Sequence, residues 1–294
     1  MVSVVIPSRA QQYLQQTIDD LLAKAEDEVE IIVVLDGYWP NPILYDNPRV
    51  VILHHGLVHD NVGMRGSINA GIDLARGKYI MKIDEHCMVD KGYDLKLMAD
   101  CEDNWVVIPR RYRLDAENWK VIEDGRPPID YMYIENKDGY LHGTEWKRPE
   151  RTSILIDDTM SFQGSCWFMK KKFWDEAIGP MDDANYGPFA NEAQEIGNKA
   201  WLSGGSVKVN KNTWYAHYHK TKNSQGLDFS NNQHKAYRDG IERGRSFGTD
   251  FWLNNKWSKR VHDFEWLIKK FWPVPTWPDN WQEIYQKLSQ EQKV

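Results

Sequence analysis

The chain has 294 residues, enough to bury a large core, with 41% apolar and 27% charged residues and a net charge of −6. No apolar stretch approaches the ~18 residues that a membrane span needs, and the first residues lack the pattern of a signal peptide. Three cysteines without metal-type or disulfide spacing favour a reducing compartment, so we expect a cytoplasmic protein.

Strand-like and helix-like patterns alternate over the first hundred residues. The run at 30–35 is apolar and rich in β-branched residues, which is typical of a strand buried on both faces of a parallel sheet. The alternation predicts an α/β fold, with a mainly parallel, doubly wound sheet and helices on both faces. In chain order, the predicted elements are strands at 2–6, 30–35, 50–54 and 79–83, and helices at 13–25 and 66–75.

Polar residues follow three of these predicted strands: Pro7–Arg9, Asp36 and Asp84–His86. Open α/β sheets bind ligands at the carboxyl ends of their strands, so the clustering indicates a ligand site. The carboxylate of Asp84 and the imidazole of His86, two residues apart, can both point at one divalent cation, and this ligand pair suits Mn²⁺. A solvated loop with a capping aspartate is the alternative.

The second half of the chain has a less regular pattern. Residues 105–156 predict loops and short strands, and a helical tail rich in tryptophan follows Lys220. Most of the 14 tryptophans should pack in the core. In chain order, the other predicted elements are a strand at 162–169, helices at 170–177 and 191–202, and strands at 206–209 and 213–218.

Positive charge is concentrated in residues 199–270, which hold 14 Lys and Arg against six Asp and Glu. Such a stretch is compatible with a polyanionic partner, such as a pyrophosphate or a nucleic-acid backbone. An ordinary solvated helical surface explains it equally well.

Several stretches resemble known glycosyltransferases and follow the order that they have there. GKYIMKIDEHCM at 77–88, TMSFQGSCWF at 159–168 and the stretch 191–220 resemble the polypeptide N-acetylgalactosaminyltransferases. VVIPSR and VVLDG, together with Asn61-Val62-Gly63 followed by Asn69-Ala70-Gly71, resemble glycosyltransferase family 2. The resemblance covers about residues 3–220. It implies a Rossmann-like GT-A fold that uses a metal ion and a UDP-sugar donor.

The resemblance also implies residue roles. Asp84, His86 and His217 are expected to hold Mn²⁺ or Mg²⁺. Glu192 falls on the acid that holds the donor-sugar hydroxyls or the acceptor, and Lys220 occupies the position of a phosphate-binding arginine. The remaining donor residues are Pro7, Arg9 and Asp36 around the nucleoside, Asn61, Gly63 and Arg65 near the donor, with Arg65 at a phosphate, and Gly164 in a turn that the sugar approaches. For Asp36, capping of the following loop is the alternative.

We therefore expect a metal-dependent glycosyltransferase that moves a sugar from a UDP-sugar to a hydroxyl acceptor. Retention of configuration is favoured, whereas inversion would need a carboxylate base such as Glu192. The acceptor is open among a saccharide, a protein and hydroxymethylated DNA bases, the last by analogy with phage enzymes. A non-catalytic sugar-nucleotide-binding module is a further alternative. A nucleotidyltransferase would need a glycine-rich loop after the first strand, and Pro7-Ser8-Arg9 is not one.

The expected domains are a GT-A domain at 1–220 and a Trp-rich helical C-terminal extension at 221–294. Within the GT-A domain, residues 1–104 form the nucleotide-binding half and residues 105–220 form the acceptor and metal half.

Overall fold

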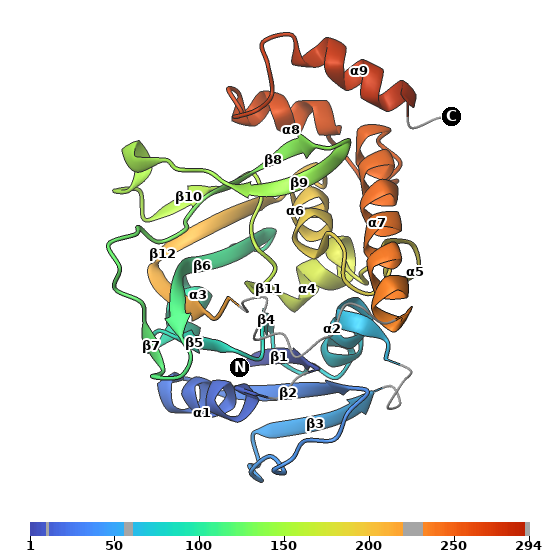
Figure 1. Cartoon of the computed structure of the whole chain (residues 1–294). Helices are drawn as coiled ribbons and strands as arrows, with labels where there is room; N and C mark the ends of the chain where they lie inside the picture. The colour runs from blue at the N-terminus through green and yellow to red at the C-terminus, as the bar shows by residue number, and fades with distance from the viewer. Residues whose placement is uncertain (10–11, 56–60, 220–231, 292–294) are drawn as a thin grey trace.

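The computed structural model describes residues 1–9, 12–55, 61–219 and 232–291, and its centre is one large mixed sheet (Figure 1). The strand order is β10-β12-β6-β11-β4-β1-β2-β3, with β5 paired to β12 and β7 paired to β6. The strands are β1 (Val2–Ser8), β2 (Val29–Asp36), β3 (Val50–His55), β4 (Tyr79–Ile83), β5 (Cys87–Val89), β6 (Trp105–Asp115), β7 (Lys120–Val121), β8 (Met132–Lys137), β9 (Tyr140–Glu145), β10 (Ile156–Asp158), β11 (Cys166–Lys170) and β12 (Ser206–His217). The helices are α1 (Leu14–Lys24), α2 (Gly63–Asp73), α3 (Tyr93–Ala99), α4 (Lys171–Phe173), α5 (Asp183–Tyr186), α6 (Glu192–Leu202), α7 (Asn232–Leu253), α8 (Phe264–Phe271) and α9 (Trp281–Glu291), together with a 3₁₀ turn at Pro149–Arg151 and a π-helical turn at Trp174–Ile178.

The first four long strands form the parallel part of the sheet. β1 pairs in parallel with β2 and β4, and β2 pairs in parallel with β3, as the sequence predicts. Pro7 does not end the first strand, although its position suggested a stop, because it still pairs with Val34 of β2. Pairing with β4 ends at Val5, so the missing N–H of Pro7 breaks no bond on that side.

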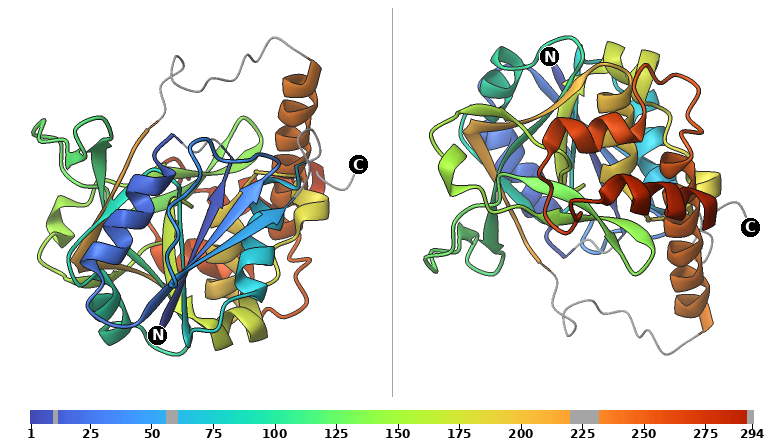
Figure 2. Two further views of the ribbon diagram at one scale, coloured as in Figure 1. Left: turned by 90° about the horizontal axis from the view of Figure 1, so that it is seen from below. Right: turned by 90° about the horizontal axis from the view of Figure 1, so that it is seen from above.

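The two faces of the sheet carry two separate hydrophobic cores. Alternate residues of β1 point to opposite faces, so Val4 belongs to one core and Val5 to the other. Helices α1 and α3 cover the face of Val4, and α2 and α6 cover the face of Val5. Figure 2 shows α1 and α2 on the two sides of the parallel strands. The predicted α/β fold with helices on both faces is confirmed.

The second half of the sheet differs from the prediction in two places. Residues 105–115 form β6, a long strand inside the region that was expected to be irregular. Pro109 and the arginines after it break the apolar pattern by which strands are recognised. The two strands expected at 206–209 and 213–218 form a single strand, β12, with a register shift between Asn210 and Trp214. β11 runs antiparallel between β4 and β6, which makes the sheet mixed.

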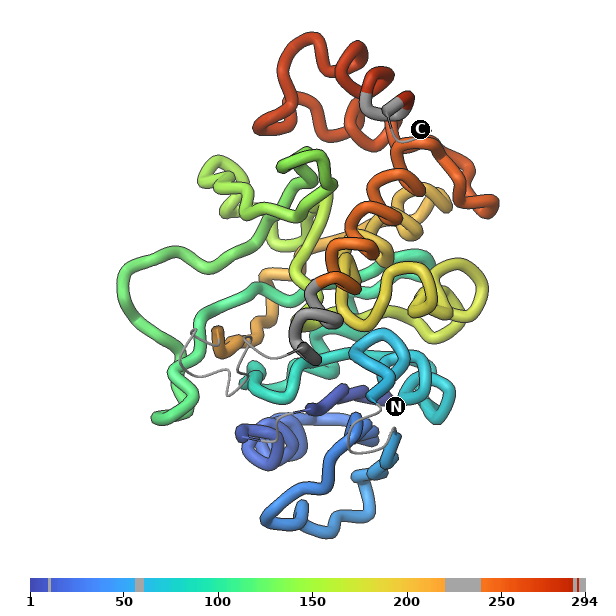
Figure 3. Tube along the Cα trace, turned by 45° about the vertical axis from the view of Figure 1, so that its right-hand side comes forward, coloured from blue at the N-terminus to red at the C-terminus, as the bar shows by residue number. Residues whose placement is uncertain are grey.

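The described C-terminal helices pack on the same core as α2 and α6. Trp252 of α7 and Leu267 of α8 belong to the cluster that contains Val5 of the central strand. α7 runs beside α5 and the β8–β9 hairpin (Figure 3). Gly244 permits this close approach, since a Cβ there would lie 2.0 Å from the carbonyl oxygen of Tyr186. The domain boundary expected at residue 220 stays a prediction. The buried tryptophans are Trp167, Trp174, Trp201, Trp252, Trp257, Trp277 and Trp281.

Candidate active site

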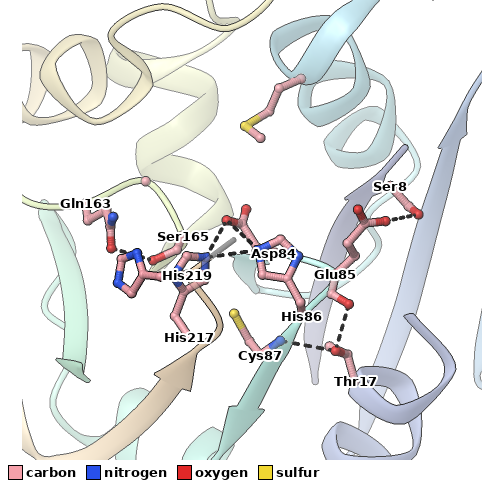
Figure 4. A network of polar contacts seen from close by, with 12 residues as sticks. Ser8, Thr17, Asp84, Glu85, His86, Cys87, Gln163, Ser165, His217 and His219 are labelled. Atoms are coloured by element: carbon pink, nitrogen blue, oxygen red, sulfur yellow. Dashed lines mark hydrogen bonds and ion pairs between the residues drawn. The ribbon is translucent and has the colours of Figure 1, made fainter. Parts of the chain in front are cut away.

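Three side chains from two distant parts of the chain meet at the carboxyl end of β4 (Figure 4). Asp84 follows β4, His86 precedes β5, and His217 ends β12. Because β12 pairs with β5, with His217 opposite Cys87, the sheet itself brings the two histidines together. Their Nε2 atoms are 3.1 Å apart, and Oδ2 of Asp84 lies 3.2 Å from Nε2 of His217. The three candidate ligand atoms lie within 4.8 Å of one another.

This set of one carboxylate and two imidazoles fits a divalent metal such as Mn²⁺. Burial lowers the pKa of the His217 imidazole, in spite of its hydrogen bond to Asp84, so the ring is neutral. Burial alone would raise the pKa of the Asp84 carboxyl, but Lys82 and the two histidines hold it well below its usual range. Asp84 and His217 therefore have the protonation states that metal ligation requires.

Lys82 is a site residue that the sequence analysis missed. It lies within β4, its side chain is fully buried, and its Nζ is 2.6 Å from both Oδ1 of Asp84 and the backbone oxygen of Gly164. Nζ also lies 3.3 Å from Oε1 of Glu192. Burial would lower the pKa of Lys82, but the two carboxylates raise it above its usual value, so the amine is charged. The signal in the sequence was a charge inside the apolar run Ile80–Ile83.

Glu192 and Gly164 lie together, and Lys82 links both to the metal candidates. Glu192 begins α6, and its Oε1 accepts a hydrogen bond of 2.9 Å from Nε1 of Trp167. Burial raises the pKa of Glu192, although Lys82 counteracts part of the shift. A Cβ at position 164 would lie 2.9 Å from the Glu192 carboxylate, so a larger residue in this turn would displace that carboxylate.

The Asp36 carboxylate, at the end of β2, caps the start of helix α2. Its Oδ1 accepts from the backbone N–H of Val62 at 2.8 Å, and its Oδ2 accepts from that of Gly63 at 2.9 Å. Gly63 has a φ of +80°, and a Cβ there would clash with Pro188 at 2.4 Å. Asp36 and Gly63 thus orient the first turn of α2. Contact of Asp36 with a nucleoside stays a prediction.

The end of β1 holds a second polar group, built around Glu85. The Glu85 carboxylate accepts hydrogen bonds from the hydroxyl of Ser8 and from the backbone N–H of Arg9, the latter at 3.2 Å (Figure 4). The side-chain oxygen of Asn61 accepts from the guanidinium of Arg9 at 2.7 Å, with the amide in the orientation that satisfies both groups. Pro7 is buried within β1. The structure therefore brings Pro7, Arg9 and Asn61 to one edge of the sheet.

Arg65 lies in a different environment from the one expected. Its guanidinium is fully buried, forms an ion pair with Glu195, and lies 4.2 Å from the ring centre of Tyr186. Its Nε donates to the backbone oxygen of Ala190 at 3.0 Å. Because this side chain is enclosed and already paired, the expected phosphate contact is wrong for this arrangement. Arg65 instead joins α2 to α6.

Lys220 lies outside the described residues, three positions after His217. Many other cations of the basic stretch form ion pairs, such as Lys270 with Asp158 at 3.0 Å. This pairing favours an ordinary charged surface over a polyanion-binding face. The described lysines of this stretch that form ion pairs are Lys199, Lys208, Lys211, Lys256, Lys269 and Lys270.

Two curated relatives are similar to part of this chain. Glycosyltransferase GlyG of Streptococcus pneumoniae is 25% identical over 177 residues, covering 57% of this chain and 51% of GlyG. A provisionally named polypeptide N-acetylgalactosaminyltransferase 13 of Drosophila melanogaster is 23% identical over 240 residues, covering 71% of this chain and 40% of that protein. The chain spans about half or less of the length of the curated relatives it matches.

A solved structure and a family profile agree with these relatives. GalNAc-T7 with UDP, GalNAc and Mn²⁺ matches with a TM-score of 0.69 at 16% identity, covering 92% of this chain and 56% of the other. This likeness confirms the GT-A fold. No helix of the described ranges is long and apolar enough to cross a membrane. The profile of glycosyl transferase family 2 matches residues 3–176, more than half of the chain. The chain therefore belongs to glycosyl transferase family 2.

Proposed function

We propose that the chain transfers a sugar from a UDP-sugar to a hydroxyl acceptor, using a divalent metal held by Asp84, His86 and His217. The observation that carries the proposal is the meeting of these three ligand atoms within 4.8 Å at the carboxyl end of β4. Ligands bind at this edge in open α/β sheets. The fold likeness to GalNAc-T7, whose structure contains UDP, GalNAc and Mn²⁺, supports a UDP-linked donor and Mn²⁺.

The chain's own residues prepare a charged site of defined geometry. A metal bound by the three ligands would stabilise the charge that develops on the departing diphosphate. Lys82 fixes one oxygen of Asp84 through Oδ1, which leaves Oδ2 directed toward the histidines. The same amine holds Glu192, so the metal ligand and the acid expected at the donor sugar keep a constant separation.

The environment of Glu192 supports retention of configuration. In transfer, the acceptor hydroxyl oxygen bonds to the anomeric carbon as the bond from that carbon to the diphosphate breaks, and the electron pair leaves with UDP. Inversion needs a carboxylate that takes the hydroxyl proton. Glu192 is held by Lys82 and by Trp167, which suits a residue that anchors sugar hydroxyls better than a free base. The hydroxyl proton then passes to the departing phosphate.

A DNA acceptor gains no support from the described residues. Several lysines of the basic stretch that suggested it form ion pairs within the protein, as at Lys256 with Asp250 and Lys269 with Glu265. A hydroxyl of a saccharide or a protein is therefore the acceptor class that we propose.

The decisive experiment is a screen of UDP-sugars for hydrolysis by the chain with and without Mn²⁺. We expect one donor to be hydrolysed slowly, and only with metal present. Candidate acceptors are then added, and NMR of the product gives its anomeric configuration. Hydrolysis that persists in a chelator would contradict the metal assignment, and an inverted product would contradict retention.

A further inference from the structure

A buried arginine without an anionic partner lies beside the candidate metal ligands. Arg111 of β6 is 7% exposed, and its Nη1 lies 3.2 Å from Nε2 of His219. No carboxylate in the described part of the chain forms an ion pair with Arg111. Glu145 acts on it electrostatically, but not from ion-pair distance. Because a buried charge is costly unless an opposite charge compensates it, this guanidinium is prepared for an anion that the described residues do not supply.

A second arginine, Arg113, lies on the same face of the sheet and is half-buried. β6 pairs in parallel with β12, so that Arg111 lies opposite Tyr215 and Arg113 opposite His217. Residues opposite each other on paired strands project to the same side. Arg113 donates from Nη1 to the backbone oxygen of Pro127 at 3.1 Å, and no described carboxylate pairs with it. Two cations that form no ion pair with a described carboxylate therefore lie next to His217.

The neighbouring arginines are compensated within the chain. Arg110, on the same strand, binds Asp130 through two hydrogen bonds of 2.8 Å. Arg126, on the loop that follows β7, pairs with Asp124. Of these four neighbouring arginines, Arg111 and Arg113 are thus the two that form no ion pair with a described carboxylate.

The position of this arginine pair identifies the kind of anion. In Figure 4, His219 lies on the side of His217 away from Ser8 and Glu85, the edge where a nucleoside is expected. Arg111 contacts His219, so the pair lies beyond the metal ligands from that edge. Guanidinium groups bind phosphate oxygens through directed, charge-assisted hydrogen bonds.

We propose that Arg111 and Arg113 form a binding site for a phosphate group beside His217. The phosphate comes either from the diphosphate of the donor or from a phosphate that the acceptor carries. The assignment of these two sources rests on the proposed function, whereas the binding of a phosphate group by the two arginines does not.

The test titrates two probes into the full chain in Mg²⁺ buffer, with calorimetric detection. UDP is titrated alone, and inorganic phosphate is titrated both alone and with UDP at saturation. Arg113→Gln removes a half-buried charge, and Arg111→Lys keeps the charge but loses the planar fork. Arg126→Gln is the matched control, because it removes a nearby arginine that Asp124 already compensates. Thermal unfolding checks that each variant is folded.

We expect Arg111→Lys and Arg113→Gln each to lower the affinity for phosphate or for UDP by about tenfold. The control Arg126→Gln should change neither affinity. If phosphate still binds when UDP is at saturation, and the variants weaken that binding, the site belongs to the acceptor. Weakened UDP binding without separate phosphate binding assigns it to the donor. Unchanged affinities for both probes in both folded variants would overturn the proposal. Phosphate binding without any turnover of UDP-sugars would contradict the proposed function and leave the phosphate site standing.

Discussion

The two ends of the candidate site are built in different ways. At the nucleoside end, Asp36 binds the backbone amides of Val62 and Gly63, and Glu85 binds Ser8, all within the first hundred residues. At the proposed metal end, Lys82 of β4 meets Glu192, and His86 meets His217, each more than a hundred positions later in the chain. The hydrogen bonds at the proposed nucleoside end therefore lie within the parallel half, whereas the proposed metal end forms only when both halves of the sheet are joined. Changes at the metal end should consequently have the larger effects.

The largest effect is expected from removal of the ligand that joins the two halves. His217→Ala should lower metal-dependent turnover of the UDP-sugar by more than about 100-fold, because even partners of metal ligands contribute 10–100-fold. Binding of Mn²⁺ measured by calorimetry should weaken in parallel, while thermal unfolding changes little. The control is Glu117→Gln, which alters an exposed side chain outside the site. Unaltered Mn²⁺ affinity in His217→Ala would remove this residue from the metal site.

Lys82→Met should destabilise the fold by about 3–5 kcal/mol, since it leaves two buried carboxylates without their cation. Denaturant unfolding measures the loss. Adding Glu192→Gln should recover part of it, because the double variant leaves one uncompensated carboxylate instead of two. Mn²⁺ should stabilise the single variant more than the natural chain. A cost below about 1 kcal/mol would show that the ion-pair network does not join the halves.

Gly244→Val tests whether the C-terminal helix supports the metal end. A Cβ at this position would lie 2.0 Å from the carbonyl oxygen of Tyr186, so α7 must move away from α5 at a cost of about 1–3 kcal/mol. Gly240→Ala is the matched control, because its Cβ would meet nothing closer than 3.5 Å. Chemical unfolding compares the two variants. Equal stability would mean that the contact of α7 with α5 adds nothing.

The smallest effect is expected at the nucleoside end. Asp36→Ala removes the acceptor for two amides of the first turn of α2 and should cost about 1 kcal/mol of unfolding free energy. Titration with UDP separates this cap from the predicted nucleoside contact. A loss of stability with unchanged UDP affinity would make Asp36 only a cap, and a loss of affinity would support both roles.

The sequence alone determined the parallel half and the local part of the site. Continuous β-branched runs and alternating helical patterns depend on neighbours within a few residues, so the first four long strands could be read directly. Asp84 and His86 were found for the same reason, since both follow one predicted strand. His217 and Glu192 needed the resemblance to a family, because no local pattern distinguishes a ligand from a packed side chain.

Only the tertiary structure decided which charged groups of the site pair with one another. The partner of a buried cation is fixed by distance in space, and no spacing along the chain predicts it. Arg65 looked like a phosphate ligand but pairs with Glu195, whereas Lys82, which looked like one charge in an apolar strand, links Asp84 to Glu192. β6 was hidden for a related reason. Its arginines break the apolar pattern of a strand, and the sheet tolerates them because they reach carboxylates or the site and avoid the apolar core.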